Sequence, residues 1–287
     1  MESQTVSTVF LQAALAVIML GLGLGLTVED FRRVVRYPRA VAVGLVCQML
    51  LLPLVCFGIA ILFALPPALA VGLMLLAASP GGATANLFSH LARGDVALNI
   101  SLTAVNSVLS VVTLPIIVNL AIGFFMGEER SIPLQLTKTI QVFAVVLIPV
   151  GIGMLVRAHA PRVADRMSRP VKILSALFLV LVVVGSIARE RRLLLEYAGQ
   201  IGLAALTFNL ISLAVGYLVP RLVRLDERQA IAIGMEIGIH NGTLAIAIAS
   251  SPNLLNDTTM AMPPAIYSII MFFTAAIFGW AVNRRRR

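Results

Sequence analysis

The sequence predicts an all-α polytopic membrane protein of nine transmembrane helices, arranged as an inverted-repeat transporter fold with two discontinuous helices. The composition predicts the membrane class: 59% of the 287 residues are hydrophobic, 12% are charged, and the mean hydropathy is +0.98. These values lie far from those of soluble globular proteins. The inverted repeat is predicted from two apolar segments, one in each half of the chain, that contain helix-breaking residues.

Nine segments are long enough to cross a hydrocarbon layer of about 30 Å, which takes about 20 residues in a helix. They cover residues 8–27, 40–64, 68–92, 96–122, 136–157, 171–188, 200–219, 230–249 and 263–283. The first segment follows Met1-Glu2-Ser3-Gln4, which has no positive charge, and it is too long for the apolar core of a signal peptide. We therefore expect it to be a mature span.

The basic residues lie in the short loops between these spans, so the net charge of +9 is read as an orientation signal and not as a nucleic-acid surface. Seventeen of the 22 Lys and Arg residues fall on one side of the nine-span topology. Cytoplasmic loops of membrane proteins carry this excess. We expect the N-terminus outside and the C-terminus in the cytoplasm, most simply in a bacterial inner membrane.

The third span contains the first break, in the segment from Ser79 to Asn86. It reads Ser-Pro-Gly-Gly-Ala-Thr-Ala-Asn, and a proline followed by two glycines interrupts a helix. The eighth span contains the second break, from Gly234 to Thr243, where Glu236, His240 and Asn241 stand among three glycines.

Glu236 is the ionisable residue that stands out, because it lies in the interior of an apolar span. A carboxylate at membrane depth is costly and indicates a functional site. The third span runs inward and the eighth outward, so two broken helices of opposite direction occupy corresponding places in the two halves. We expect a first repeat over residues 1–127, broken around 80–86, and a second over 128–287, broken around 236–242, with a cation site between the breaks.

These segments resemble the bile acid:sodium symporter family. The resemblance runs from Gly21–Thr27 through Gln48 and Pro53 to the Pro-Gly-Gly segment, which is followed by Leu-Ala-Arg-Gly at 91–94, and on to Glu236-Ile237-Gly238 with Asn241. It implies a ten-helix fold of core and panel domains with two crossing discontinuous helices, of which this chain looks like the version without the first helix. It also implies sodium-coupled import of an organic anion such as a bile acid-like or small carboxylate compound, without a further cofactor.

The resemblance implies two sodium sites that share Glu236. The first would use Ala85, Asn86, Asn99, Thr103 and Glu236, and the second Gln48, Glu236, Ile237, Ile239 and His240. Ala85 stands where the family commonly has serine, and His240 where it has glutamine. The substrate would contact Thr84, Asn86, Asn241, Gly242, Thr243 and Ser268.

Other classes stay open at this stage. Proton coupling is an alternative, because His240 offers nitrogen where sodium prefers oxygen. An arsenite-exporter-like protein of the same fold is disfavoured, because Cys47 and Cys56 lie in neither broken span. An intramembrane enzyme lacks a second carboxylate and a His-Glu-x-x-His motif, which leaves His240 with Ser268 as a weak candidate.

Overall fold

In the computed structural model of the protein, the described residues are 16–127, 136–177, 191–251 and 254–284, with single gaps at 18, 22, 172, 175 and 176. These residues form helices joined by short turns, and no strand occurs among them. The first half contains α2 (Val28–Arg32), η1 (Arg33–Arg36), α3 (Pro38–Val46), η2 (Cys47–Leu51), α4 (Leu52–Leu62), α5 (Pro67–Ala78), α6 (Ala83–Leu91) and α7 (Val96–Met126). The second contains α8 (Leu136–His159), α10 (Arg191–Leu222), α11 (Glu227–Gly238), α12 (Gly242–Ser250), η4 (Thr259–Ala261) and α13 (Met262–Arg284).

Five stretches of the described residues are long and apolar enough to span a membrane: Pro38–Leu62, Val96–Met126, Gly199–Leu222, Glu227–Ser250 and Thr259–Arg284. They fall on five of the nine predicted spans. The predicted span 68–92 is divided between α5 and α6, and 136–157 coincides with α8. The predicted spans 8–27 and 171–188 lie largely outside the described residues, so the total of nine stays a prediction.

The distribution of side chains is that of a membrane protein. Large apolar residues are exposed on the outer helices, for example Leu120 and Phe124 on α7 and Phe273 and Ile277 on α13, each more than 60% exposed. Buried polar residues lie on the inner faces of the same bundle. They include Gln48, Asn99, Thr103, Asn106, Asn209, Glu236 and His240. Because lipid surrounds the outer face, the polar groups find partners inside.

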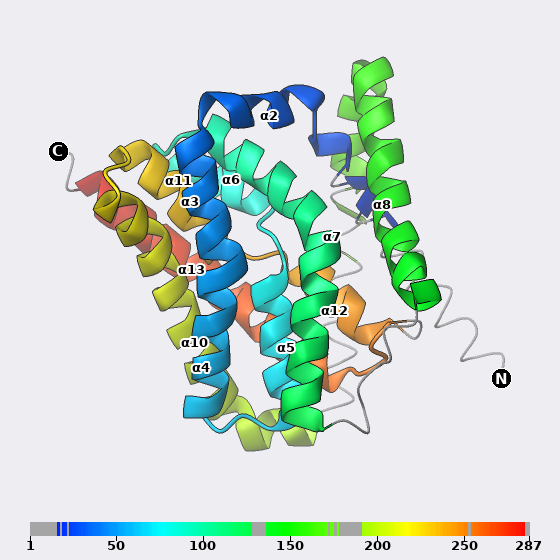
Figure 1. Cartoon of the computed structure of the whole chain (residues 1–287), viewed down its shortest axis with the longest axis vertical. Coiled ribbons are helices and arrows are strands. Elements are labelled where there is room, and N and C mark those ends of the chain that lie inside the picture. The colour runs from blue at the N-terminus through cyan, green and yellow to red at the C-terminus, as the bar shows by residue number, and fades with distance from the viewer. Residues whose placement is uncertain are drawn as a thin grey trace.

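Two broken helices cross in the middle of the molecule (Figure 1). The helix pair α5 and α6 is interrupted at 79–82, and the pair α11 and α12 at 239–241. Helix α11 packs against α6, and α12 packs against α5. The first half-helix of each pair therefore lies beside the second half-helix of the other, so the two pairs run in opposite directions.

The turn that leads into each broken helix has the same geometry in both halves, 160 residues apart. Ala64 and Arg224 adopt left-handed conformations, with φ of 45° and 61°. The next residues, Leu65 and Leu225, donate their N–H groups back to the carbonyls of Ala60 and Pro220, at 3.0 and 2.9 Å. A conformation that most residues avoid thus recurs at corresponding places.

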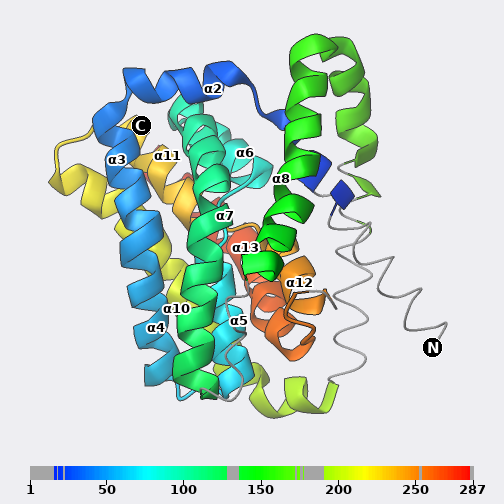
Figure 2. The ribbon, with the colours of Figure 1, turned by 45° about the vertical axis from the view of Figure 1, so that its right-hand side comes forward.

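Helices α3 and α11 begin at the same end of the bundle (Figures 1 and 2), and arginines lie in and just before their first turns: Arg36, Arg39, Arg224 and Arg228. Contacts join their segments there: Arg39 donates to the Val223 carbonyl at 2.6 Å, and Asp95 N–H donates to the Arg228 carbonyl at 2.9 Å. The opposite end holds the turn between α4 and α5, where Gln200 donates to the Ala64 carbonyl at 3.2 Å. We call the first the arginine-rich end.

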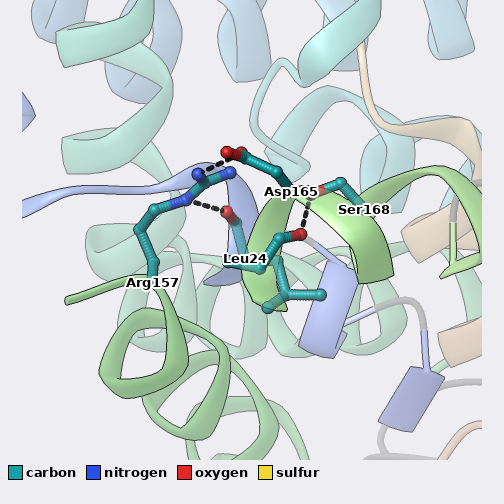
Figure 3. Close-up of polar contacts among 5 residues, drawn as sticks. Leu24, Arg157, Asp165 and Ser168 are labelled. Carbon is teal, nitrogen blue, oxygen red and sulfur yellow. Dashed lines mark hydrogen bonds and ion pairs between the residues drawn. The ribbon is translucent and has the colours of Figure 1, made fainter. Parts of the chain in front are cut away.

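Helix α8 stands beside the N-terminal segment and is fastened to it by Arg157 (Figure 3). The guanidinium donates to the Leu24 carbonyl at 2.7 Å and pairs with Asp165, on the helix over 161–171, at 2.6 Å. Gly23 lies so close to the Val150 carbonyl that a Cβ at this position would collide with it. Gly23 thus allows the N-terminal segment to pack closely against α8, whereas a Cβ at Gly25 would meet nothing within 4 Å.

The two ends of the bundle should face opposite sides of the membrane. We expect Arg36→Cys, at the arginine-rich end, to react with a membrane-impermeant maleimide from the cytoplasmic side, and Leu62→Cys, at the other end, from the outside. Both positions are exposed, whereas the native Cys47 and Cys56 are buried, so the parent protein is the unlabelled control. Labelling of both variants from one side would contradict this arrangement.

Candidate functional site

The two helix breaks are in direct contact and share hydrogen bonds. The N–H of Asn241 donates to the Pro80 carbonyl at 2.8 Å, and Nδ1 of His240 lies 3.0 Å from the Ser79 carbonyl. In a continuous helix the Asn241 N–H would bond to the Ile237 carbonyl, so the break frees that oxygen from its usual partner. The irregular backbone of each break is thus satisfied by the other, as membrane depth requires.

Glu236 lies in the last turns of α11 and is fully buried beside the first break. Its Oε2 accepts a hydrogen bond of 2.6 Å from the Thr103 hydroxyl, and its Oε1 one of 3.2 Å from the Asn106 amide. The carboxylate also lies against Gly81, where a Cβ would stand 2.6 Å from its Cδ. Among the described residues no cationic side chain pairs with it.

The residues predicted for the first sodium site lie on three elements that converge here. Asn99 and Thr103 come from one face of α7, Asn86 and Ala85 from the first turns of α6, and Glu236 from α11. The Asn99 amide donates to the Ala232 carbonyl at 2.6 Å. The oxygens of Asn86 and Asn99 are buried without a hydrogen-bond partner among the described residues.

Of the residues predicted for the second site, Gln48 and His240 both contact the end of α5. Gln48 donates through Nε2 to the carbonyls of Ala77 and Ser79, at 3.0 and 3.2 Å, and its own Oε1 is buried without a partner in the described part of the chain. It stands in η2, a π-helical turn that the sequence did not predict, and such turns are frequent at functional sites. Ile237 and Ile239 are buried, and the side chain of Ile237 lies against Gly216 of α10.

His240 is held by aromatic rings as well as by backbone. Its ring stacks on Phe208 at a centroid distance of 5.6 Å and 10° between planes, and lies 5.5 Å from the ring of Tyr267. Because a carbonyl accepts a hydrogen bond from Nδ1, that nitrogen carries a proton, and the buried Nε2 has no partner among the residues that the structure describes. The imidazole is therefore fixed in orientation.

The residues predicted to contact substrate lie around the starts of the second half-helices. Thr84 is in the first turn of α6, while Asn241 caps α12 by accepting from the Leu244 N–H at 3.0 Å. Gly242 and Thr243 begin α12, and Ser268 packs against Gly242 from α13. Ser268 donates to the Pro264 carbonyl at 2.7 Å, so its hydroxyl is not engaged with His240 as a serine hydrolase would need.

Three polar residues of this region were not assigned from the sequence. Asn106 donates to Glu236, while Asn209 and Tyr267 both donate to the Gly238 carbonyl at 2.9 Å. Asn106 could have been found from its spacing, because it follows Thr103 by three residues and Asn99 by seven on one helix face. Asn209 and Tyr267 carry no such signal, since their partner is a backbone carbonyl of another helix.

The described residues contain no group of three His, Cys, Asp or Glu side chains that could hold a metal ion. What the site offers is one carboxylate with amide, hydroxyl and carbonyl oxygens. Oxygen ligands of this kind suit hard cations.

An apolar outer surface, a polar interior and two broken helices crossing at a buried carboxylate define an integral membrane protein with the architecture of secondary transporters. Residues 12–197 match the model of the Sodium Bile acid symporter family, and the chain belongs to that family. The resemblance noted in the sequence is thereby confirmed. The matched residues include the first break, Asn99 and Thr103, while Glu236 lies beyond them.

Similar proteins extend over both halves of the chain. The uncharacterized sodium-dependent transporter YocS of Bacillus subtilis is 30% identical over 255 residues, which are 89% of this chain and 77% of that protein. The probable sodium/metabolite cotransporter BASS2 of rice chloroplasts is 28% identical over 90% of this chain and 60% of its own length. Human sodium/bile acid cotransporter 4 is 30% identical over 94% and 62%. The chain thus spans about three fifths of the rice and human proteins.

The closeness of Gly81 to Glu236 predicts a difference between two neighbouring glycines. In Gly81→Ala the new methyl group would overlap the carboxylate, whereas in Gly82→Ala it would stand 3.9 Å from the Asn241 amide. Overpacking a buried site costs about 1–3 kcal/mol. We expect Gly81→Ala to lower the melting temperature of the purified protein clearly, and Gly82→Ala to leave it within about a degree. Equal effects would mean that the carboxylate has room to move away.

Proposed function

We propose that this protein is a sodium-coupled symporter that imports an organic anion by alternating access. The observation that carries the proposal is the environment of Glu236, a fully buried carboxylate that receives hydrogen bonds without a cationic side chain among the described residues. A buried charge that lacks a compensating charge is strongly destabilising. A bound cation supplies that charge.

The surrounding oxygens favour sodium as that cation. Gln48, Asn86, Asn99 and Asn106 each hold a buried amide oxygen without a hydrogen-bond partner among the described residues. Leaving such groups unpaired costs about 1–3 kcal/mol each. Ligation of a hard monovalent ion would satisfy these oxygens and the carboxylate together. The names of the relatives from Bacillus, rice and man all refer to sodium, which agrees with this choice.

We assign the ions to the two sites that the sequence indicates. The first joins Glu236 to Asn86, Asn99 and Thr103, with Ala85 offering only its carbonyl. The second joins Glu236 to Gln48, His240 and the carbonyls of Ile237 and Ile239. The first site draws on α6 and α11, which are half-helices of the two different breaks, so sodium binding there would fix the two broken helices relative to each other.

The substrate would be anionic because two helix N-termini lie beside the crossing. Helices α6 and α12 begin at Ala83 and Gly242, directly after the breaks, and helix N-termini attract negative charge. Thr84, Asn86, Asn241, Thr243 and Ser268 would supply the polar contacts there. Among organic anions, bile acid-like compounds and small carboxylates fit this chemistry.

Alternating access would follow from the repeat. The opposite run of the two broken helices and the matching turns at Ala64 and Arg224 support an inverted repeat that divides the chain at 127 and 128. The gathering of arginines at the arginine-rich end supports an orientation with that end in the cytoplasm. A bacterial inner membrane is the setting we propose.

Proton coupling is the second candidate, because His240 has a buried ring nitrogen without a described partner. A proton on that nitrogen would replace the second sodium without a change of fold.

Replacement of the buried carboxylate tests the main proposal. We expect sodium, but not potassium, to raise the melting temperature of the parent protein, and Glu236→Gln to abolish that shift while the protein stays monodisperse in detergent. Glu236→Ala should behave alike. The matched control is Glu29→Gln, since Glu29 is an exposed carboxylate near Arg36 and distant from the site. A sodium response of parental size in Glu236→Gln would contradict both assigned sites.

Replacement of the imidazole tests the second site. In His240→Gln the amide would keep the hydrogen bond to the Ser79 carbonyl through Nε2 and offer Oε1 to the ion, so we expect a midpoint sodium concentration lower by about tenfold, equivalent to about 1.4 kcal/mol. The control is His159→Gln, at an exposed position near the end of α8. An unchanged sodium midpoint in His240→Gln would remove His240 from the ion site, and an increased one would favour the proton.

A further inference from the structure

A stripe of polar side chains runs along α7 beyond the predicted sodium site. Asn99, Thr103, Asn106, Ser110 and Thr113 follow one another at intervals of four and three residues, which places them on one helix face. The first four are buried, and Thr113 is half-buried. Asn99 and Thr103 are explained by Glu236 and its site. The continuation through Asn106, Ser110 and Thr113 is not.

A small cavity lies against this continuation. Its lining includes Gln48, Pro80, Asn106, Ser110 and Thr113, and its volume is about 10 Å³, close to the space that one water molecule needs. Gln48 and Asn106 are 97–99% buried, and the amide oxygen of each has no hydrogen-bond partner among the described residues. A polar cavity of this size with such oxygens in its lining is suited to a water molecule or a small cation.

Asn106 links the cavity to the carboxylate. Its amide N–H₂ donates to Oε1 of Glu236 at 3.2 Å, which turns the carbonyl end of the same amide away from Glu236. Ser110 donates its hydroxyl proton to the Ser107 carbonyl at 2.9 Å and keeps its lone pairs as acceptors. Side-chain oxygens of Thr113, Ser110 and Asn106 therefore follow one another along this face of α7 toward the carboxylate of Glu236.

The stripe leads away from the arginine-rich end. Helix α7 begins at Val96, next to that end, and ends at Met126 on the opposite side (Figures 1 and 2). From Thr103 to Thr113 the helix advances by about 15 Å. Pro115, just beyond Thr113, has no N–H to offer the Val111 carbonyl, so that acceptor lacks its usual helical donor. A cation that approaches along this face avoids the field of the arginines.

We propose that Asn106, Ser110 and Thr113, with the cavity against Gln48, form the access route along which a monovalent cation reaches Glu236 from the end opposite the arginine-rich end. The route serves the sodium site of the proposed function and rests on it for the identity of the ion. Its polar oxygens replace part of the hydration shell step by step, and the carboxylate attracts the ion inward.

Cysteine accessibility tests the route without knowledge of the substrate. Ser110→Cys and Thr113→Cys, in the purified full-length chain, are treated with 2-aminoethyl methanethiosulfonate, a cation, and with neutral methyl methanethiosulfonate. We expect the cation to react roughly tenfold faster than the neutral reagent, after correction for their rates with a free thiol. In combination with Glu236→Gln this preference should disappear. The parent protein controls for the buried native cysteines.

Ser101→Cys is the matched control on the same helix. Ser101 is fully buried, and its hydroxyl donates to a carbonyl of α7 at 2.9 Å as that of Ser110 does, but it lies off the stripe. It should stay unreactive with both reagents. Ile117 also lines the cavity and follows Thr113 by four residues on α7, so a substitution there tests the direction of the route. Ile117→Phe should slow both reagents at Ser110→Cys if access comes from that end.

The outcomes are separable. The route would be overturned if Ser110→Cys and Thr113→Cys were as unreactive as Ser101→Cys. It would also be overturned if they reacted without a preference for the cationic reagent. An unchanged rate in Ile117→Phe would overturn its direction. A cation preference that sodium and potassium reduce equally would keep the route and count against sodium coupling.

Discussion

The crossing of the two breaks is the constraint on which the rest of the structure depends. At membrane depth no water satisfies an interrupted backbone, so the break after Ala78 and the break after Gly238 need partners from the protein. They find them in one another, through the bonds from Asn241 to Pro80 and from His240 to Ser79. Neither break is stable alone, and the bundle is arranged so that α5, α6, α11 and α12 meet.

The same contact explains why the polar residues of the interior are so concentrated. Carbonyls next to the breaks accept hydrogen bonds from elements outside the two broken helices: from Gln48 of η2, Asn209 of α10 and Tyr267 of α13. The donors leave their own amide oxygens behind, as at Gln48 and Asn209. A surplus of oxygen acceptors around one carboxylate follows from the need to satisfy two breaks at one place.

The sequence indicated the breaks and Glu236, because proline, paired glycines and a membrane-depth carboxylate are local signals. It did not indicate whether the N–H₂ group or the oxygen of each Asn and Gln side chain would be left without a hydrogen-bond partner. Gln48 was expected as an ion ligand. Its N–H₂ group donates to the Ala77 and Ser79 carbonyls, so its oxygen is the atom that stays free to face an ion. The contact of Asn106 with Glu236 joins residues 130 apart, and the stacking of His240 on Phe208 joins α10 to the second break. Such pairs depend on how helices pack, which a local pattern does not contain.

The π-helical turn at Cys47–Leu51 has a consequence for comparison between relatives. A π turn holds one residue more than the α-helical turn it replaces, so it acts as an insertion within an otherwise regular helix. A relative that lacks the turn would have one residue fewer between Gly44 and Pro53, and a residue aligned with Gln48 would then point about 100° away around the helix axis. An alignment gap at this place would therefore mark the loss of the proposed ion ligand even where the glutamine itself is kept.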